Sequence, residues 1–237
     1  MRRVALTVAV LACCGGPAAP TASAAKAPVV RHLVAFKSGA TVERKVRARG
    51  LTVKVGRRRC AAGTATPLAA LLRSKPGRIG LRDFGSCSRR ARDSGQLFVR
   101  SIRKERNRGL DGWVYKVGRK WASAGAADPA GPFGRGRLRT GARVTWFYGH
   151  SRGGSFQRTL ELTAKRSGTG TVAVRVRGYD DDGRGVAVEG ADVFARGASA
   201  VTDSGGAAVL RLPPGAYVVR AAKRGLVPSF GERVTVR

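Results

Sequence analysis

Residues 169–178 read TGTVAVRVRG, and in this stretch Val172, Val174 and Val176 alternate with small or charged residues. Alternation with a period of two is typical of a strand that buries one face. Similar short runs recur up to the C-terminus, separated by turn sequences such as DDDGRG (180–185) and PPG (213–215). Short strands at near-regular spacing predict an all-β antiparallel sandwich over residues 169–237.

A different pattern precedes this sandwich. Residues 66–74, TPLAALLRS, predict a helix, because Thr66 is a good N-cap and Pro67 suits the first helical position. The residues around the helix predict strands at 29–36, 41–46, 51–56, 96–102, 113–117 and 143–148. We therefore expect an α+β domain over residues 25–155 and a linker over residues 156–168.

The N-terminus has the features of an export signal. Arg2 and Arg3 precede nine apolar residues, VALTVAVLA (4–12), and ASA (22–24) follows. This order predicts a secretory signal peptide over residues 1–24, and nine apolar residues are too few to span a bilayer. Alternatively, VLAC (10–13) makes Cys13 a lipidated anchor. In either case we expect a secreted or cell-surface protein with no transmembrane segment after cleavage.

Two cysteines, Cys60 and Cys87, remain after that cleavage. Cysteines in an exported chain most often pair, and the disulfide would contribute about 3–4 kcal/mol by chain entropy. Two cysteines without a nearby histidine do not complete a zinc site. We expect neither a metal nor a cofactor.

Positive charge dominates the composition, with a formal net charge of +32. Residues 25–160 hold 32 Lys or Arg and 6 Asp or Glu, whereas residues 161–237 hold 12 and 8. A field this positive attracts anionic partners, which outside a cell include wall polymers, anionic lipid headgroups and nucleic acid. A GC-rich genome is the alternative source of the arginines, but it does not explain the shortage of acids in the first module.

Large aromatic residues gather in GLDGWVYKVGRKWASAGAADP (109–129) and RVTWFY (143–148). Their alternation places Trp113 and Tyr115 on one face of a strand, and Trp146 and Tyr148 on one face of another. Such residues form either a core or the wall of a groove with a basic rim. On the groove interpretation, the candidate ligand-binding residues are Trp113, Tyr115, Trp121, Trp146, Tyr148, Arg106, Arg108, Arg119 and Lys120.

Two family resemblances add to this interpretation. Residues 161–237, with VEGADVFA, TDSGGAAVLRL and PPGAY, resemble the carboxypeptidase regulatory-like family, which implies a transthyretin-like sandwich without catalytic function. Residues 50–148, with TPLAALL, GWVYKVGRKWASAGAADP and LRTGARVTWFY, resemble the transcobalamin-like C-terminal domain, which implies a β-grasp-like fold. Val117-Gly118-Arg119 departs from the Val-Asn-Gly of relatives, and the carrier's helical barrel is missing, so we do not expect corrinoid binding.

Catalytic motifs are weak. His150 lies near Ser151 and Ser155, but the chain has no G-x-S-x-G elbow. YDDDG (179–183) resembles half of a calcium loop, although a hairpin turn is the commoner outcome. The sequence therefore predicts an exported, non-catalytic envelope or extracellular protein whose basic first module binds anionic ligands. The alternatives are a sequence-nonspecific nucleic-acid or polyanion binder and a secreted hydrolase.

Overall fold

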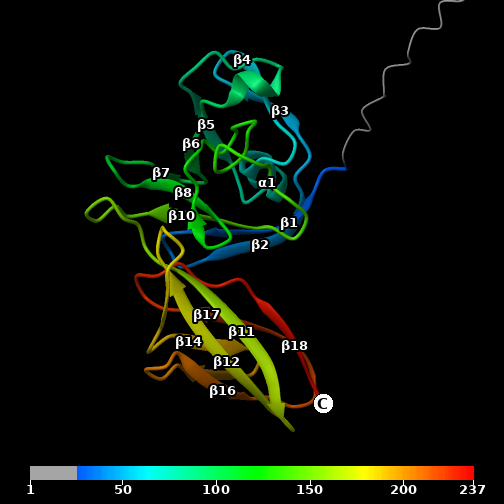
Figure 1. The fold of residues 1–237 in the computed structure, drawn as a ribbon, viewed down its shortest axis with the longest axis vertical. Helices are drawn as coiled ribbons and strands as arrows, with labels where there is room; N and C mark the ends of the chain where they lie inside the picture. The colour runs from blue at the N-terminus through cyan, green and yellow to red at the C-terminus, as the bar shows by residue number, and fades with distance from the viewer. Residues whose placement is uncertain (1–25) are drawn as a thin grey trace, which may run out of the picture.

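The computed structural model describes residues 26–237, and these residues form two β-rich modules stacked end to end (Figure 1). The predicted signal peptide and the alternative anchor at Cys13 lie outside the described residues. Within residues 26–237, no helix has the length and apolar character needed to cross a membrane.

The first module contains ten strands and one α-helix. Its elements are β1 (Val29–Ala35), β2 (Thr41–Arg47), β3 (Leu51–Val55), β4 (Arg58–Ala62), α1 (Pro67–Ser74), β5 (Ile79–Asp83), β6 (Leu97–Ile102), β7 (Glu105–Arg106), β8 (Gly112–Val117), β9 (Lys120–Trp121) and β10 (Arg143–Gly149). A short 3-10 helix, Ala91–Ser94, precedes β6. The predicted helix is confirmed, and the Thr66 hydroxyl accepts a hydrogen bond from the Ala69 N–H at 3.2 Å.

The main sheet of this module has the strand order β2-β1-β10-β8-β9. The central pair, β1 and β10, is parallel, and each of these strands pairs antiparallel with its outer neighbour. Helix α1 covers one face of the sheet, and Leu68 and Leu71 join the core there. Of the two smaller sheets, β3-β4 and β5-β6-β7, the strands β3, β4 and β5 lie toward the end of the module farther from the second module, whereas β7 lies beside β8 of the main sheet (Figure 1).

The second module consists of two four-stranded antiparallel sheets. Its strands are β11 (Thr159–Gly168), β12 (Thr171–Tyr179), β13 (Gly185–Ala187), β14 (Asp192–Ala195), β15 (Ala198–Val201), β16 (Ala207–Arg211), β17 (Gly215–Ala222) and β18 (Glu232–Val236). In one sheet β12 pairs with β11, β13 and β16, and the other has the order β15-β14-β17-β18. Valines of both sheets, including Val174 and Val219, share one core, as a sandwich requires.

Hydrogen bonds of two side chains, Thr202 and Asp203, stabilise the TDSGG turn (202–206). Asp203 Oδ1 accepts hydrogen bonds from the backbone N–H groups of Gly205 and Ala207, both at 2.9 Å. The Thr202 hydroxyl donates to the Val188 carbonyl at 2.6 Å and accepts from the Ala191 N–H at 2.8 Å. The motif is therefore structural, because it satisfies backbone groups at the edge of the sandwich.

Two sequence predictions are wrong in this region. Residues 156–168, the expected linker, contain strand β11, which pairs with β12 along its whole length. Leu160 and Leu162 are buried while Thr163 and Lys165 are exposed, so the stretch carries a strand alternation that its charged residues obscured. Residues 186–195, expected as one kinked strand, divide between β13 in one sheet and β14 in the other.

Candidate anion-binding face

Of the two interpretations of the aromatic residues on β8 and β10, the structure supports the core. Trp113, Tyr115, Trp146 and Tyr148 are between 2% and 6% exposed. Tyr115 stacks on Trp146 with ring centroids 5.0 Å apart, and Trp113 meets Tyr148 edge to face at 5.9 Å. The large apolar area of four rings on neighbouring strands is best stabilised by burial, so these rings are not available to a ligand.

Hydrogen bonds fix the polar ends of three of these aromatic residues, Trp113, Tyr115 and Tyr148, inside the module, whereas Trp146 Nε1 is buried without a partner. Trp113 Nε1 donates to the Glu105 carbonyl at 3.0 Å, and the Tyr115 hydroxyl donates to the Ala124 carbonyl at 2.6 Å. Burial raises the pKa of the Tyr115 phenol above its ordinary value, and the charge of Asp128 acts in the same direction. The phenol is therefore a structural donor.

The remaining candidate residues divide between two places. Trp121 is 42% exposed and packs edge to face on Phe156, where the two modules meet. Arg119 also lies there, and its guanidinium donates to both carboxylate oxygens of Glu161 at 2.8 and 2.7 Å. Lys120 lies beside Gly183, which adopts a left-handed backbone conformation in the YDDDG turn. A Cβ atom on Gly183 would come within 2.9 Å of the Lys120 side chain, so the two residues pack closely.

Acids of the second module pair with several of the cations that face it. Lys116 is fully buried, and its ammonium lies 3.1 Å from Asp181 Oδ1 and donates to the carbonyls of Tyr179 and Asp180. Burial lowers the pKa of Lys116, and the Asp181 carboxylate opposes that effect. The YDDDG turn is thus a docking element, and the described residues contain no group of three or more metal-ligating side chains.

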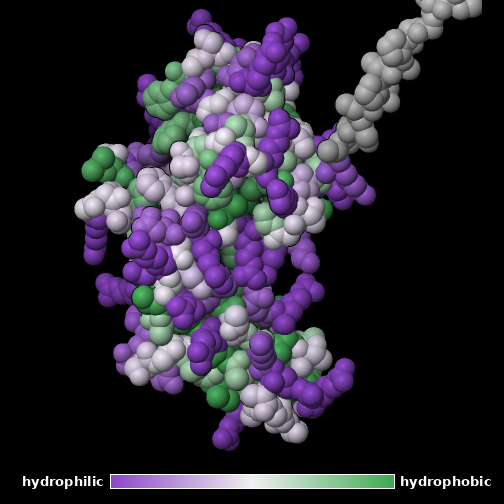
Figure 2. Space-filling model, in the orientation of Figure 1, coloured by the Kyte–Doolittle hydropathy of each residue, from purple (hydrophilic) through white to green (hydrophobic). Residues whose placement is uncertain are grey.

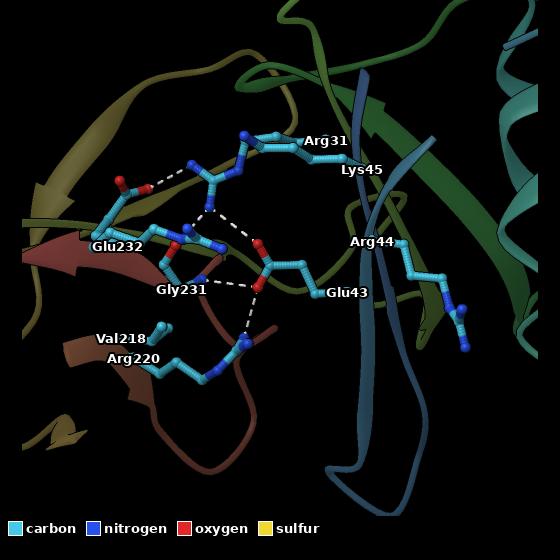
Figure 3. Close-up of a pocket in the computed structure, with 9 residues that line it drawn as sticks. Arg31, Glu43, Arg44, Lys45, Val218, Arg220, Gly231 and Glu232 are labelled. Atoms are coloured by element: carbon cyan, nitrogen blue, oxygen red, sulfur yellow. Dashed lines mark hydrogen bonds and ion pairs between the residues drawn. The ribbon is translucent and has the colours of Figure 1, made fainter. Parts of the chain in front are cut away.

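A second charge network joins the modules at the other edge of the main sheet, around β2 and β1. Glu43 on β2 lies between Arg31 at 3.0 Å and Arg220 at 2.7 Å, and it also accepts from the Gly231 N–H (Figure 3). Glu232 pairs with Arg31 and Arg143. Burial opposes ionisation of Glu43, but the hydrogen bonds and charges of Gly231, Arg31 and Arg220 prevail, so its pKa is lowered. These groups satisfy one another and hold the modules together.

The β3-β4 hairpin and the β5-β6-β7 sheet, toward the far end of the first module, carry cations that mostly lack such partners; Arg58, 3.5 Å from Asp83, is the exception. Two hollows of about 640 and 540 Å³ share Leu81 and Arg100 and so form one continuous surface. We name this surface the basic face. Its charged lining residues are Arg57, Arg58, Arg78, Arg82, Arg100, Arg103, Lys104 and Arg106, with Asp83 as the single acid. Figure 2 shows many hydrophilic side chains at this end of the molecule.

Strand geometry explains why these arginines share a surface. Along β6, Leu97 and Val99 point into the core, so Phe98 and Arg100 point outward. Arg82 on β5 lies opposite Phe98 in the sheet, and its guanidinium lies 4.6 Å from the ring of Phe84. Phe84 and Phe98 are 60% and 43% exposed and meet edge to face at 5.8 Å. One exposed aromatic pair therefore borders the basic face beside Arg82.

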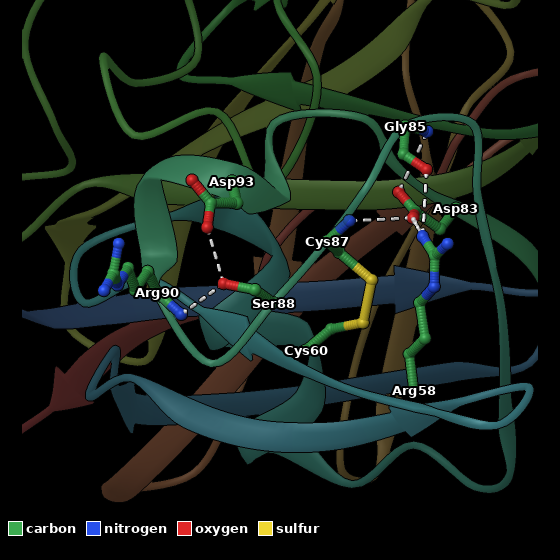
Figure 4. Close-up of a disulfide and its surroundings, with 8 residues drawn as sticks. All are labelled: Arg58, Cys60, Asp83, Gly85, Cys87, Ser88, Arg90 and Asp93. Atoms are coloured by element: carbon green, nitrogen blue, oxygen red, sulfur yellow. Dashed lines mark hydrogen bonds and ion pairs between the residues drawn. A yellow bond between two sulfur atoms is a disulfide. The ribbon is translucent and has the colours of Figure 1, made fainter.

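The disulfide fixes one edge of the basic face. Cys60 on β4 bonds to Cys87, as the sequence predicted, with the Cα atoms 5.3 Å apart (Figure 4). Asp83 accepts a hydrogen bond from the Cys87 N–H at 2.9 Å and lies 3.5 Å from Arg58. The crosslink thus ties the β3-β4 hairpin, which carries Arg57 and Arg58, to the β5-β6 connection.

Sequence reasoning found only part of this surface. Of the candidate cations, Arg106 lies on the basic face, whereas the backbone of Arg108 pairs with that of Asp111 in a tight turn. Arg57, Arg58, Arg78, Arg82, Arg100 and both phenylalanines were missed. The alternation of LFVRSI (97–102) would have placed Phe98 and Arg100 on the outer face of their strand.

His150 was the candidate catalytic base of the hydrolase alternative. Its Nδ1 lies 2.8 Å from Asp111 Oδ2, and the Ser151 N–H donates to the other Asp111 oxygen at 3.0 Å. The hydrogen bond with His150 lowers the pKa of Asp111. The pair is half-exposed, and His150 lies where the two modules meet.

Searches against protein-family models, curated proteins and solved structures found no match to this chain. The two family resemblances therefore stay predictions, and the function must be argued from the chain's own geometry.

Proposed function

We propose that this chain is an exported, non-catalytic protein of the cell envelope or extracellular space that binds anionic polymers on the basic face. The observation that carries the proposal is the continuous lining of eight cations around a single acid. That acid, Asp83, is 8% exposed and already accepts hydrogen bonds from two backbone N–H groups. Asp83 also lies 3.5 Å from Arg58, so the other seven cations of the lining have no acid partner among the described residues.

The distribution of charge supports a ligand at this end of the molecule. On the surface that the first module presents to the second, acids pair with several cations, as Glu161 does with Arg119 and Asp181 with Lys116. Equivalent acids do not line the basic face, so its field extends into solvent and attracts anions.

The shape of the basic face favours an extended ligand. Its two hollows are open and meet at Leu81 and Arg100, so a chain of regularly spaced anionic groups could contact several arginines in succession. Arginine binds phosphate through two parallel N–H donors. A phosphate-bearing wall polymer therefore fits this surface better than a compact small molecule does.

Export is part of the proposal, and one structural feature supports it. The Cys60–Cys87 disulfide suits an oxidising compartment. We also propose that the first module is a β-grasp-like domain of the transcobalamin-like type. The parallel central pair between two antiparallel partners supports this assignment. The TDSGG turn supports the carboxypeptidase regulatory-like assignment of the sandwich.

The test compares two variants of equal charge. The triple variant R78Q/R100Q/R106Q removes three cations from the basic face, and R175Q/R196Q/R211Q removes three exposed cations from the sandwich. We expect the first variant to weaken binding to polyglycerol phosphate and to lower the slope of log K against log salt by about two units. Equal weakening by the sandwich variant would overturn the proposal, because binding would then follow net charge alone.

Single-stranded nucleic acid is the second candidate ligand, because Phe84 and Phe98 are exposed among arginines. Bases stacked on aromatic side chains contribute about 1–3 kcal/mol each. If nucleic acid is the ligand, Phe98→Ala weakens binding of oligothymidylate at least about fivefold and leaves polyglycerol phosphate unaffected. Val209→Ala, at an exposed apolar site of the sandwich, is the control.

A further inference from the structure

A cleft separate from the basic face lies where the two modules meet. It has a volume of about 460 Å³, which is within the range of small-molecule sites. Its walls come from the turn after β1, the end of β10 and the turn after β17. We name it the junction cleft, and neither module forms it alone.

The floor of the junction cleft is apolar. Ala35, Phe147 and Val227 line it and form a small cluster of their own at the module boundary. Phe147 points away from the aromatic core of the first module, because its neighbours Trp146 and Tyr148 belong to that core. These three side chains are almost fully buried, so the apolar surface that the floor offers to a ligand comes from Leu226 and Pro228, which line the cleft and are half-buried.

The rim of the junction cleft is cationic. Lys37, Lys223 and Arg224 line it, and Asp192 is the only acid that does so. The Lys37 ammonium is held 3.6 Å from the ring centre of Tyr148, and Lys223 donates to the Glu189 carbonyl. These contacts leave the charges of the two lysines without a carboxylate partner among the described residues.

His150 completes the polar side of the junction cleft. It also lines an adjoining hollow of about 270 Å³ that contains Arg152. Because Nδ1 of His150 is engaged by Asp111, Nε2 is the ring atom that remains for a ligand. Cations and a histidine therefore surround an apolar floor.

We propose that the junction cleft binds a small organic anion with an apolar body, such as a medium-chain carboxylate or the corresponding phosphate monoester. The anionic group lies at the rim near Lys37 and Arg224, and the apolar body lies on Leu226 and Pro228, above the buried cluster of Phe147 and Val227. Because both modules contribute to the site, the ligand stabilises their association by mass action.

Calorimetric titration of the full chain tests the proposal with four probes. Octanoate and octyl phosphate carry both features, acetate lacks the apolar body, and 1-octanol lacks the charge. We expect saturable binding of octanoate or octyl phosphate, with acetate and 1-octanol each weaker by about tenfold or more. The better of the two octyl anions identifies the headgroup. Absence of saturable binding for both would overturn the proposal.

Variants locate the site. K37Q/R224Q removes two rim cations and should weaken binding about tenfold, whereas K165Q/R166Q, at the exposed end of β11, should leave it within about twofold. Ala222→Phe fills the cleft without changing charge and should abolish octanoate binding while sparing retention on polyglycerol phosphate. If that variant does not fold, the two charge variants decide. Equal weakening by K165Q/R166Q, or unchanged binding in K37Q/R224Q, would overturn the assignment.

Discussion

His32 provides a sharp test of the core of the first module. The side chain lies on β1, is fully buried, and neither ring nitrogen has a hydrogen-bond partner in the structure. Burial lowers the pKa of His32 from 6.5 to about 3. The folded protein therefore holds a neutral imidazole under conditions in which the unfolded chain binds a proton.

The sign and size of the effect follow from linkage. As pH falls below 6.5, the unfolded state takes up the proton first, so stability present at neutral pH is lost progressively until the pH reaches about 3. Between pH 7 and pH 5 this single group should lower the free energy of unfolding by about 2 kcal/mol. Since whole domains have about 5–15 kcal/mol of stability, the loss is large enough to measure.

The perturbation is His32→Met, which nearly conserves volume and removes the titrating group. Urea unfolding at pH 7 and pH 5 gives the two free energies, and tryptophan fluorescence reports on the first module because Trp113, Trp121 and Trp146 all lie there. Carboxylates also titrate in acid, so the quantity of interest is the difference between the native chain and the variant. We expect the variant to lose about 2 kcal/mol less than the native chain over this interval.

His150 is the matched control, because it is the only other histidine and its side chain is 46% exposed. His150→Met should retain the acid sensitivity attributed to His32. If His32→Met loses as much stability between pH 7 and pH 5 as the native chain, the buried imidazole is not the source of the effect and the reasoning is wrong.

Three further predictions concern stability and packing. The double variant C60A/C87A should lose about 3.5 kcal/mol of stability by the chain-entropy estimate, measured by urea unfolding, and should weaken polyglycerol phosphate binding because the hairpin with Arg57 and Arg58 is released. Lys116→Met should destabilise the protein by about 3 kcal/mol, because it leaves Asp181 without its buried partner; an unchanged unfolding midpoint would argue against the docking contact. In acrylamide quenching, Trp121→Phe should remove most of the quenchable fluorescence, since Trp113 and Trp146 are buried; strong quenching that persists would place those rings in a groove.

Local sequence signals predicted much of the fold. Thr66-Pro67 located the helix start, and the valine alternation at 172–176 located the central strand of the sandwich, because both depend on neighbouring residues alone. The mistaken linker shows the limit of this approach. Lys165 and Arg166 near the end of β11 made a paired strand look like a solvated connection, and its pairing depends on β12.

The candidate site was harder to predict because it is assembled from distant segments. Arg57, Arg82 and Arg100 are separated by many residues and become neighbours only through the β5-β6 pairing and the disulfide. For the aromatic residues, the local sequence pattern was sufficient to place them on shared strand faces. Whether those faces are buried depends on the helix and loops that cover them, which the local pattern does not reveal.

The pairing of opposite charges where the modules meet has a consequence for any attempt to study the halves separately. Expressing residues 26–156 alone would uncover Arg31, Lys116, Arg119 and Arg143, whose partners in the full chain include Glu232, Asp181 and Glu161. Such a fragment would adhere to polyanions through a surface that the intact molecule conceals. Polyanion affinities measured on this fragment would exceed those of the full chain, because the exposed cations would add a binding surface that the full chain does not have.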